Sequence, residues 1–385
     1  LQSVFTVNQK LDFITKGLSA YARFSFDSYS EFNNKRTGGV DLWYTNQRDG
    51  NGELVFGKPI KEGSDELYYE HSDTGERVIY TEANISYDRT FGHHNVNGMV
   101  LYNMRNRMIA TAGSAIASIP YRNQAIAARF GYGYKERYLA EVNGSYTGSE
   151  NFAPGSTRFG VFPSFSAGWI ATAEKFMENQ KIVDYLKLRA SWGRVGNDKG
   201  VNSRFMYMPA VWGGSGSYSF GINNPISQSA AAISSMGNPE VTWETAEKQN
   251  YGIDLKFFNS RLSATFDYFI EHRTGILISP ESTPNIIATS LPNLNIGKVN
   301  NHGYEISLGW RDRIGKNFGY YVDANVSFAR NKILYMDEVP KQFSYMNHTG
   351  GSTGRYSGLY NFVRLYQYSD FTTGAGGELV LNPEL

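Results

Sequence analysis

The sequence predicts an all-β chain: an antiparallel transmembrane β-barrel segment with about twelve wall strands and long external loops. Three observations support this prediction. Apolar and polar residues alternate along many stretches of about ten residues. Short and long connections between these stretches follow each other in turn, and charged residues keep to one side of the alternation. Together they describe strands with one face in lipid and the other face in a polar interior.

The clearest alternation lies between Asn250 and Ile270. On both sides of a turn at Asn259 and Ser260, every second residue is apolar and most residues between them are polar. This pattern predicts a β-hairpin with an apolar and a polar face. The hairpin alone leaves two interpretations open, because a soluble sheet packed on a core and a membrane barrel with its apolar face in lipid share the pattern.

Similar stretches occur along most of the chain. The predicted strands are residues 4–13, 18–27, 78–91, 96–103, 126–134, 138–146, 162–170, 185–192, 250–257, 262–270, 304–310 and 320–328. Shorter strand pieces are expected at 39–45 and 54–56, a short helix at 173–179, and an irregular tail after Lys332.

The lengths of the connections favour the membrane interpretation. Short connections lie near residues 14–17, 92–95, 135–136, 259–260 and 311–317, and long ones near 28–77, 108–120, 148–160, 196–242 and 274–300, with an intermediate one at 171–182. The two kinds alternate, as do the periplasmic turns and extracellular loops of outer-membrane barrels. Segment 196–242 then joins an outgoing to an incoming strand, so we expect it to be an external loop with short β pieces.

Charged residues avoid the face expected in lipid, where Arg or Lys at the membrane midplane costs about 2 to 4 kcal/mol. The residues expected to line the lumen are Arg129, Glu141, Lys187, Arg189, Asp254, Lys256, Asp267, Glu305 and Asp323. For any one of them, a hydrated wall is the simpler interpretation and contact with a solute or a plug is the alternative.

Composition excludes several other functions. The net charge is +1, with 37 basic and 36 acidic residues, so no overall field favours nucleic acid. Cysteine is absent, which rules out disulfides and thiolate metal sites in this sequence. No apolar run reaches the roughly 18 to 20 residues of a membrane-spanning helix. The six histidines are scattered and no Ser-His-Asp arrangement occurs, so we expect no metal, no cofactor and no enzymatic activity.

The long segment 196–242 carries the candidate ligand-binding residues Tyr207, Trp212, Tyr218 and Phe220. Their rings would stack on sugars or hold a peptide. Packing against neighbouring loops or against a lid is an equally simple role for them.

Five sequence blocks resemble one family. They are residues 162–169 (FPSFSAGW), 174–177 (EKFM), 186–198 (LKLRASWGRVGND), 238–245 (NPEVTWET) and 295–305 (NIGKVNNHGYE). In order and spacing they resemble the barrel of SusC/RagA-type TonB-dependent transporters of Bacteroidetes, over roughly residues 160–332, with a weaker match at 12–27.

The resemblance implies a 22-stranded barrel in the Gram-negative outer membrane, with an internal plug, a contact to TonB, and a SusD-like surface lipoprotein as a lid. Such proteins import oligosaccharides or peptides. No plug, amino-terminal extension or aromatic-ended last strand is found, so residues 1–385 are expected to be part of one barrel domain, completed by the remaining barrel and plug segments. A passive porin-like or structural barrel and a soluble carbohydrate-binding β-protein stay as alternatives.

Overall fold

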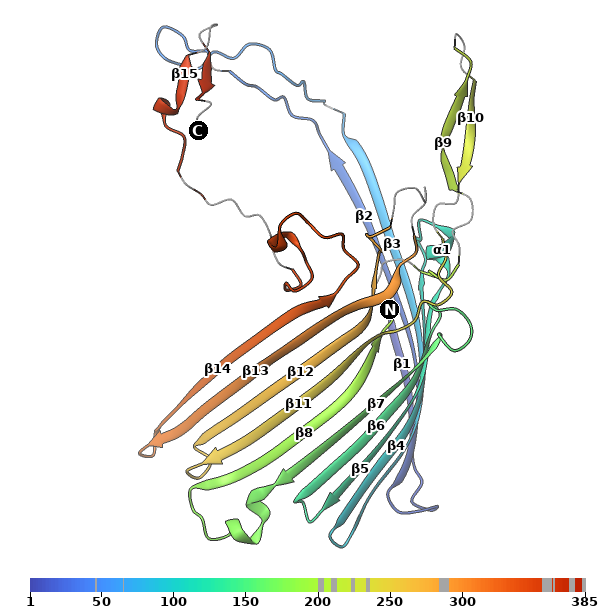
Figure 1. Ribbon diagram of the computed structural model, residues 1–385, viewed down its shortest axis with the longest axis vertical. Coiled ribbons are helices and arrows are strands. Elements are labelled where there is room, and N and C mark those ends of the chain that lie inside the picture. Colours follow the sequence, from blue (N-terminus) through green and yellow to red (C-terminus); the bar gives the residue numbers. More distant parts are fainter. Residues whose placement is uncertain are drawn as a thin grey trace.

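The computed structural model is dominated by a single twelve-stranded antiparallel sheet (Figure 1). It describes the chain except residues 46, 65, 200–203, 209–212, 223–225, 233–235, 284–290, 355–361, 363, 374–377 and 383–385, and it leaves out the side chains of 213–216 and 230–232. None of the helices in the described residues is long and apolar enough to cross a membrane.

Each strand of the sheet pairs with the next one along the wall. The strands are β1 (Gln2–Lys10), β2 (Leu18–Thr37), β3 (Tyr68–Phe91), β4 (His94–Ile109), β5 (Tyr121–Tyr134), β6 (Tyr138–Ser149), β7 (Phe159–Ile170), β8 (Val183–Asn197), β11 (Glu244–Phe257), β12 (Leu262–Ile278), β13 (Leu294–Ile314) and β14 (Phe318–Tyr335). All twelve predicted stretches overlap one of these strands, which confirms the predicted fold class.

Segment 198–243 adds no strand to the wall, because β8 pairs directly with β11. It carries a separate hairpin of β9 (Gly213–Phe220) and β10 (Ile226–Ala232), which projects beyond the end of the sheet (Figure 1). This confirms the expected external loop with short β pieces. The short turns of the wall all lie at the opposite end, at the bottom of Figure 1. We call the end with the long connections the outer end.

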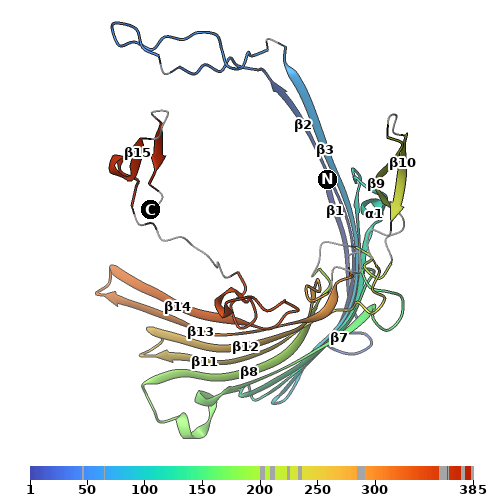
Figure 2. The same ribbon diagram turned by 45° about the horizontal axis from the view of Figure 1, so that its top comes forward.

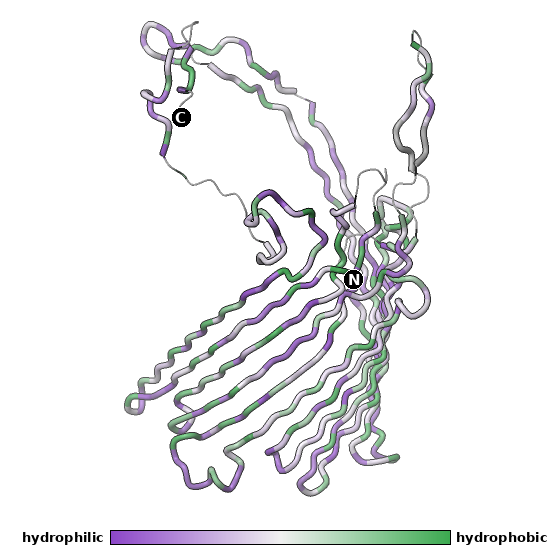
Figure 3. The backbone as a smooth tube through the Cα atoms, viewed as in Figure 1, coloured by the Kyte–Doolittle hydropathy of each residue, from purple (hydrophilic) through white to green (hydrophobic). Residues whose placement is uncertain are grey.

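The two faces of the sheet differ in chemistry. Pairing of Ile253 with Leu188 and Phe266, and of Phe266 with Ile306, continues one apolar row across four strands. Many large apolar side chains on this face are exposed, among them Phe130 at 52% and Val326 at 58%. Apolar and polar residues alternate along the wall strands in Figure 3. Such a large exposed apolar surface requires a lipid or protein cover.

The wall is curved and open. In Figure 2 the strands follow an arc that leaves a gap between β14 and the first strands. Among the described residues, β1 pairs with β2 alone and β14 with β13 alone, apart from two backbone hydrogen bonds that join Ile333 to Gly350 and Gly351 at the outer end of β14. The sheet therefore has two largely unpaired edges.

Two local predictions were wrong in the long connection between β2 and β3. Among the described residues, the pieces expected at 39–45 and 54–56 form isolated bridges, Leu42 with Lys61 and Arg48 with Leu54, and not strands. Instead, β2 and β3 continue their pairing as far as Thr37 and Tyr68. Their added residues are mostly polar, so alternation of apolar residues does not reveal them.

The helix expected at 173–179 was also wrong. The chain forms two single 3-10 turns, η1 (Ala171–Ala173) and η2 (Lys175–Met177), separated by Glu174 in an extended conformation. The Glu174 carboxylate accepts hydrogen bonds from Arg137 at 3.2 Å and from the indole of Trp169 at 3.4 Å. These bonds hold Glu174 against the ends of β6 and β7, so the backbone cannot continue as one helix.

Short elements occur outside the wall as well. They are α1 (Ala115–Ser118), in a segment expected to be a loop, and in the tail η4 (Ser344–Met346), η5 (Tyr368–Asp370), β15 (Phe371–Thr373) and β16 (Leu379–Leu381).

Candidate functional site: the polar face and the outer loops

The strand register places all nine predicted lumen residues on one face of the sheet. Arg189 pairs with Gly252, Gly252 with Asp267, and Asp267 with Glu305, so these side chains form one row across β8, β11, β12 and β13. The other members of the set, in neighbouring rows on the same face, are Arg129, Glu141, Lys187, Asp254, Lys256 and Asp323. This face is opposite to the exposed apolar face.

Arg189 is the centre of a charge network on this face. Its Nη2 lies 2.6 Å from Asp267 Oδ2, its Nε lies 3.2 Å from Asp254 Oδ2, and its Nη1 donates to Asn250 Oδ1 at 3.3 Å. A Cβ on Gly252 would lie 2.4 Å from the guanidinium carbon, so glycine gives the arginine room to cross β11. One cation thus bridges two carboxylates, and Asp267 Oδ1 is buried with no hydrogen-bond partner among the described residues.

The remaining charges are less tightly held. Arg129 and Glu141 form an ion pair of 2.9 Å, and Asn143 donates to the same carboxylate at 2.9 Å. Lys256 lies 5.9 Å from the ring centre of Tyr185. Within the described part of the chain, the other three charged residues of the predicted set make no ion pair; they are Lys187, Glu305 and Asp323.

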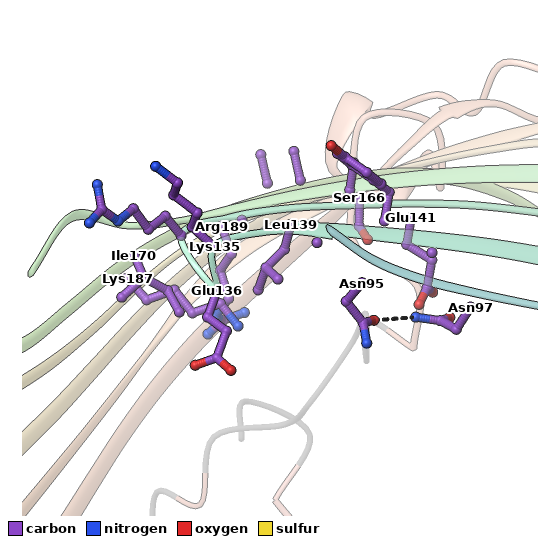
Figure 4. Close-up of a pocket in the computed structure, with 18 of the residues that line it drawn as sticks. Asn95, Asn97, Lys135, Glu136, Leu139, Glu141, Ser166, Ile170, Lys187 and Arg189 are labelled. Carbon is purple, nitrogen blue, oxygen red and sulfur yellow. Dashed lines mark hydrogen bonds between the residues drawn. The ribbon is translucent and has the colours of Figure 1, made fainter. Parts of the chain in front are cut away.

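A hollow of about 960 Å³ lies on the polar face near the short turns (Figure 4). Charged side chains of both signs line it, including Lys135, Glu136, Glu141, Lys187 and Arg189. The glycines of β5 and β7 add space between these long side chains. The hollow therefore presents a polar surface of mixed charge, without the one-sided charge that would select a small ion.

The outer loops have a hydrophobic core of their own, built from Phe152, Val241, Trp243 and Leu277. Phe152 and Val241 are 0% exposed, and the Phe152 and Trp243 ring centres lie 5.1 Å apart. Asn295 crosses this core: its amide donates to the carbonyls of Thr242 and Gly275 at 2.8 Å each, and its oxygen accepts from the Thr242 N–H at 3.0 Å. Two of the sequence blocks behind the family resemblance, 238–245 and 295–305, thus meet in this cluster.

The four predicted ligand-binding aromatics are not shown to form one site. Tyr207 is partly buried against the outer core, whereas Tyr218 and Phe220 are 71% and 64% exposed on β9. Trp212 lies outside the described residues. Tyr207 therefore packs as part of the loop base, while Tyr218 and Phe220 are free to meet another molecule.

Sequence reasoning missed Arg204. Its Nη1 donates to the Ile116 carbonyl at 3.0 Å and its Nη2 to the Pro120 carbonyl at 3.0 Å, and it forms an ion pair with Glu150. The side chain is 8% exposed. Its partners are mainly backbone carbonyls more than 80 residues away in the sequence, as the separations of 88 and 84 residues show, so no local pattern predicts them.

Another arginine–carboxylate contact lies in the tail. Arg364 Nη2 donates to Asp370 Oδ1 at 2.8 Å, and the Gln367 N–H donates to Asp370 Oδ2 at 2.8 Å. The Arg364 guanidinium, followed by the Gln367 amide, lowers the pKa of Asp370 to about 2. Among the described residues, no group of three or more His, Asp or Glu side chains is arranged to hold a metal ion.

Comparison with known proteins identifies the family. Residues 2–380 match the family "TonB dependent receptor-like, beta-barrel". The chain belongs to this family. Its members are outer-membrane receptors and transporters and not a known class of enzyme. The exposed apolar face of this wall segment is therefore the one that lipid covers.

Relatives of this TonB-dependent receptor segment are longer. TonB-dependent receptor P39 of Formosa agariphila is 29% identical over 308 residues, which cover 79% of this chain and 27% of the relative. SusC of Bacteroides thetaiotaomicron is 27% identical over 207 residues, covering 53% of this chain and 20% of SusC. The chain spans 20% to 35% of the length of the curated relatives it matches.

Solved structures share the fold. The RagAB peptide importer in its "open-open" state aligns with a TM-score of 0.64 at 18% identity, over 87% of this chain and 36% of that chain. The outer membrane transporter YddB from Escherichia coli aligns with a TM-score of 0.53 at 11% identity, over 86% of this chain and 42% of that chain.

Proposed function

We propose that this chain is the middle part of the wall of a SusC/RagA-type importer. The complete receptor would take up oligosaccharides or peptides, draw energy through TonB by way of a plug in its lumen, and work with a SusD-like surface lipoprotein as a lid. The observation that carries the proposal is the open sheet, which has a lipid-type face and a charged face but cannot enclose a pore by itself.

The unpaired edges of β1 and β14 argue for further strands. In a bilayer, each backbone group without a hydrogen-bond partner costs several kcal/mol. Because β1 runs toward the short-turn end and β14 runs away from it, closure by antiparallel pairing needs an even number of added strands. A 22-stranded barrel would need ten, since 22 minus the twelve strands present is ten.

The polar face supports the role of a lumen wall. Its charges are partly neutralised within the wall by Arg189 and by the pair of Arg129 and Glu141. The hollow near the short turns suits an irregular polar protein surface such as a plug better than a small ion, because it carries both signs of charge. The same reasoning favours a filled lumen over a simple water-filled pore.

The relatives guide the choice of substrates. One structural neighbour is described as a peptide importer, and one sequence relative is SusC. The exposed Tyr218 and Phe220 suit either class, because an aromatic ring stacks on a sugar ring and also packs against apolar peptide side chains. We therefore keep oligosaccharides and peptides as the two substrate classes to be tested.

The deciding experiment measures uptake by cells that express the complete receptor from the source gene. A fluorescent oligosaccharide mixture and a fluorescent peptide mixture would each be offered to cells with and without TonB, and with and without a protonophore. We expect one mixture to be taken up, and uptake to fall to background when TonB or the proton motive force is removed. Undiminished uptake without TonB would instead identify a passive pore. Purification of the receptor should also recover a surface lipoprotein, identified by mass spectrometry.

A further inference from the structure

Three outer connections of the barrel wall meet at Arg204. This residue lies early in the β8–β11 connection. Its guanidinium donates to the carbonyls of Ile116, Ile119 and Pro120 in the β4–β5 connection. It also forms an ion pair with Glu150 in the β6–β7 connection. One side chain thus ties together loops that belong to three different hairpins.

Arg204 is held too tightly to serve as an ordinary surface charge. The guanidinium lies 3.8 Å from the ring centre of Tyr121 and 4.6 Å from that of Phe205. Phe205 has a φ of +53°, a left-handed conformation that is unusual for a bulky residue and persists only where its surroundings impose it. Arg204 Nε is buried without a partner among the described residues, which is unfavourable. The contacts of Arg204 therefore fix how the three connections lie against one another, and do not simply add stability.

The segment after Arg204 forms the base of the β9–β10 hairpin. Met206 and Tyr207 pack against the outer hydrophobic core. The Asn238 N–H donates to the Met206 carbonyl at 2.8 Å, which joins the chain entering the hairpin to the chain leaving it. Beyond this base the hairpin carries the exposed Tyr218 and Phe220. Arg204 is thus the link between the hairpin base and the loops of β4–β7.

We propose that Arg204 is a positioning residue that sets the direction in which the β9–β10 hairpin projects beyond the end of the wall, and thereby sets where a solute meets Tyr218 and Phe220. The consequence for a solute rests on the proposed import function, whereas the position of the hairpin does not.

Distance measurement by double electron–electron resonance tests the proposal. The sequence contains no cysteine, so spin labels can be placed at Ser219→Cys on β9 and Lys298→Cys on β13 in the complete receptor, with any cysteine elsewhere replaced by serine. We expect one narrow distance distribution in detergent without substrate. Arg204→Met should at least double the width of this distribution. Arg204→Lys should give an intermediate width, because a lysine keeps the charge but reaches fewer carbonyls.

Arg137→Met is the matched control. The Arg137 side chain forms an ion pair of 3.2 Å with Glu174 at the short-turn end of the wall, so its loss should leave the label distance unchanged. If Arg204→Met fails to insert, Glu150→Gln takes its place, with a smaller broadening expected. A wild-type width in the inserted Arg204→Met protein, or in Glu150→Gln where it is used, would overturn the proposal. Because no substrate is present, this result does not depend on whether the receptor imports anything.

Discussion

The β11–β12 hairpin and the β8–β11 connection adjoin in the sequence, but different forces hold them. The hairpin is an amphipathic ladder in which Ile253 pairs with Phe266 on the lipid side and Gly252 with Asp267 on the polar side. The connection is held by a small core around Trp243 and by the contacts of Arg204 with distant loops. The surroundings on its two faces, lipid on one and a polar environment on the other, specify the structure of the hairpin, whereas tertiary contacts specify that of the connection. Substitutions in the two regions should therefore destabilise different parts of the protein.

Trp243→Ala is expected to have the largest effect, and to confine it to the outer loops. Trp243 is 8% exposed between Phe152 and Phe162, and removing a buried Trp costs about 3 to 5 kcal/mol. Hydrogen exchange of amides in 238–243 should accelerate by two or more orders of magnitude, while barrel strands keep their protection. Tyr218→Ala removes an exposed ring and is the control. A loss of strand protection in Trp243→Ala would show that wall and loops unfold together.

Phe266→Arg tests the lipid face of the wall, where the outer loops should be unaffected. A charge on the lipid face should destabilise insertion by about 2 to 4 kcal/mol if it lies near the midplane. Thr265→Arg is a matched control, because Thr265 is the next residue and lies opposite Asp254 on the polar face. The measurement is the free energy of unfolding in lipid vesicles titrated with guanidinium chloride. Equal losses in the two variants would contradict the assignment of the faces.

The same division explains what the sequence could predict. All twelve wall strands were found because residues such as Ile253 and Phe266 repeat every second position, and this period follows from the geometry of a strand between two solvents. The register then brought the predicted lumen residues Arg189, Asp254 and Asp267 together. That the polar face lines a lumen stays a prediction.

The outer region escaped prediction because its contacts are long-range and polar. Arg204 binds carbonyls 84 to 88 residues away, and a carbonyl is present at every residue, so its partners leave no mark on the sequence. The outer ends of β2 and β3 were also missed, because the residues that pair there are mostly polar and show no alternation. Tyr207 is a candidate ligand-binding residue for which packing was the alternative, and its side chain packs against the outer core. An exposed and a packed aromatic cannot be told apart without the fold.

Arg189→Met is expected to have an intermediate effect within the wall. It leaves Asp254 and Asp267 facing each other without their shared cation, and the unsatisfied partly buried groups should cost about 1 to 3 kcal/mol. Lys256→Met removes a charge of the same sign, on the same face, that makes no ion pair among the described residues, and should cost less than about 1 kcal/mol. Unfolding in vesicles compares the two. Equal costs would mean that the Arg189 network adds nothing beyond its charge.

The smallest effect is expected in the tail, where pH separates a specific contact from general acid unfolding. The Arg364 guanidinium holds the pKa of Asp370 at about 2, below the ordinary 3.8. Because the folded pKa is the lower one, the contact stabilises the tail fully above pH 3.8, and this contribution is lost as the pH falls through 2. The Gln367 amide, which donates to Asp370 Oδ2 at 2.8 Å, reports the contact directly. After correction for intrinsic exchange, its protection should persist at pH 3 and fall below about pH 2. Asp370→Asn should lower the protection at every pH and remove this step, whereas a step at pH 4 in the unsubstituted chain would show that Arg364 does not hold the carboxylate in solution.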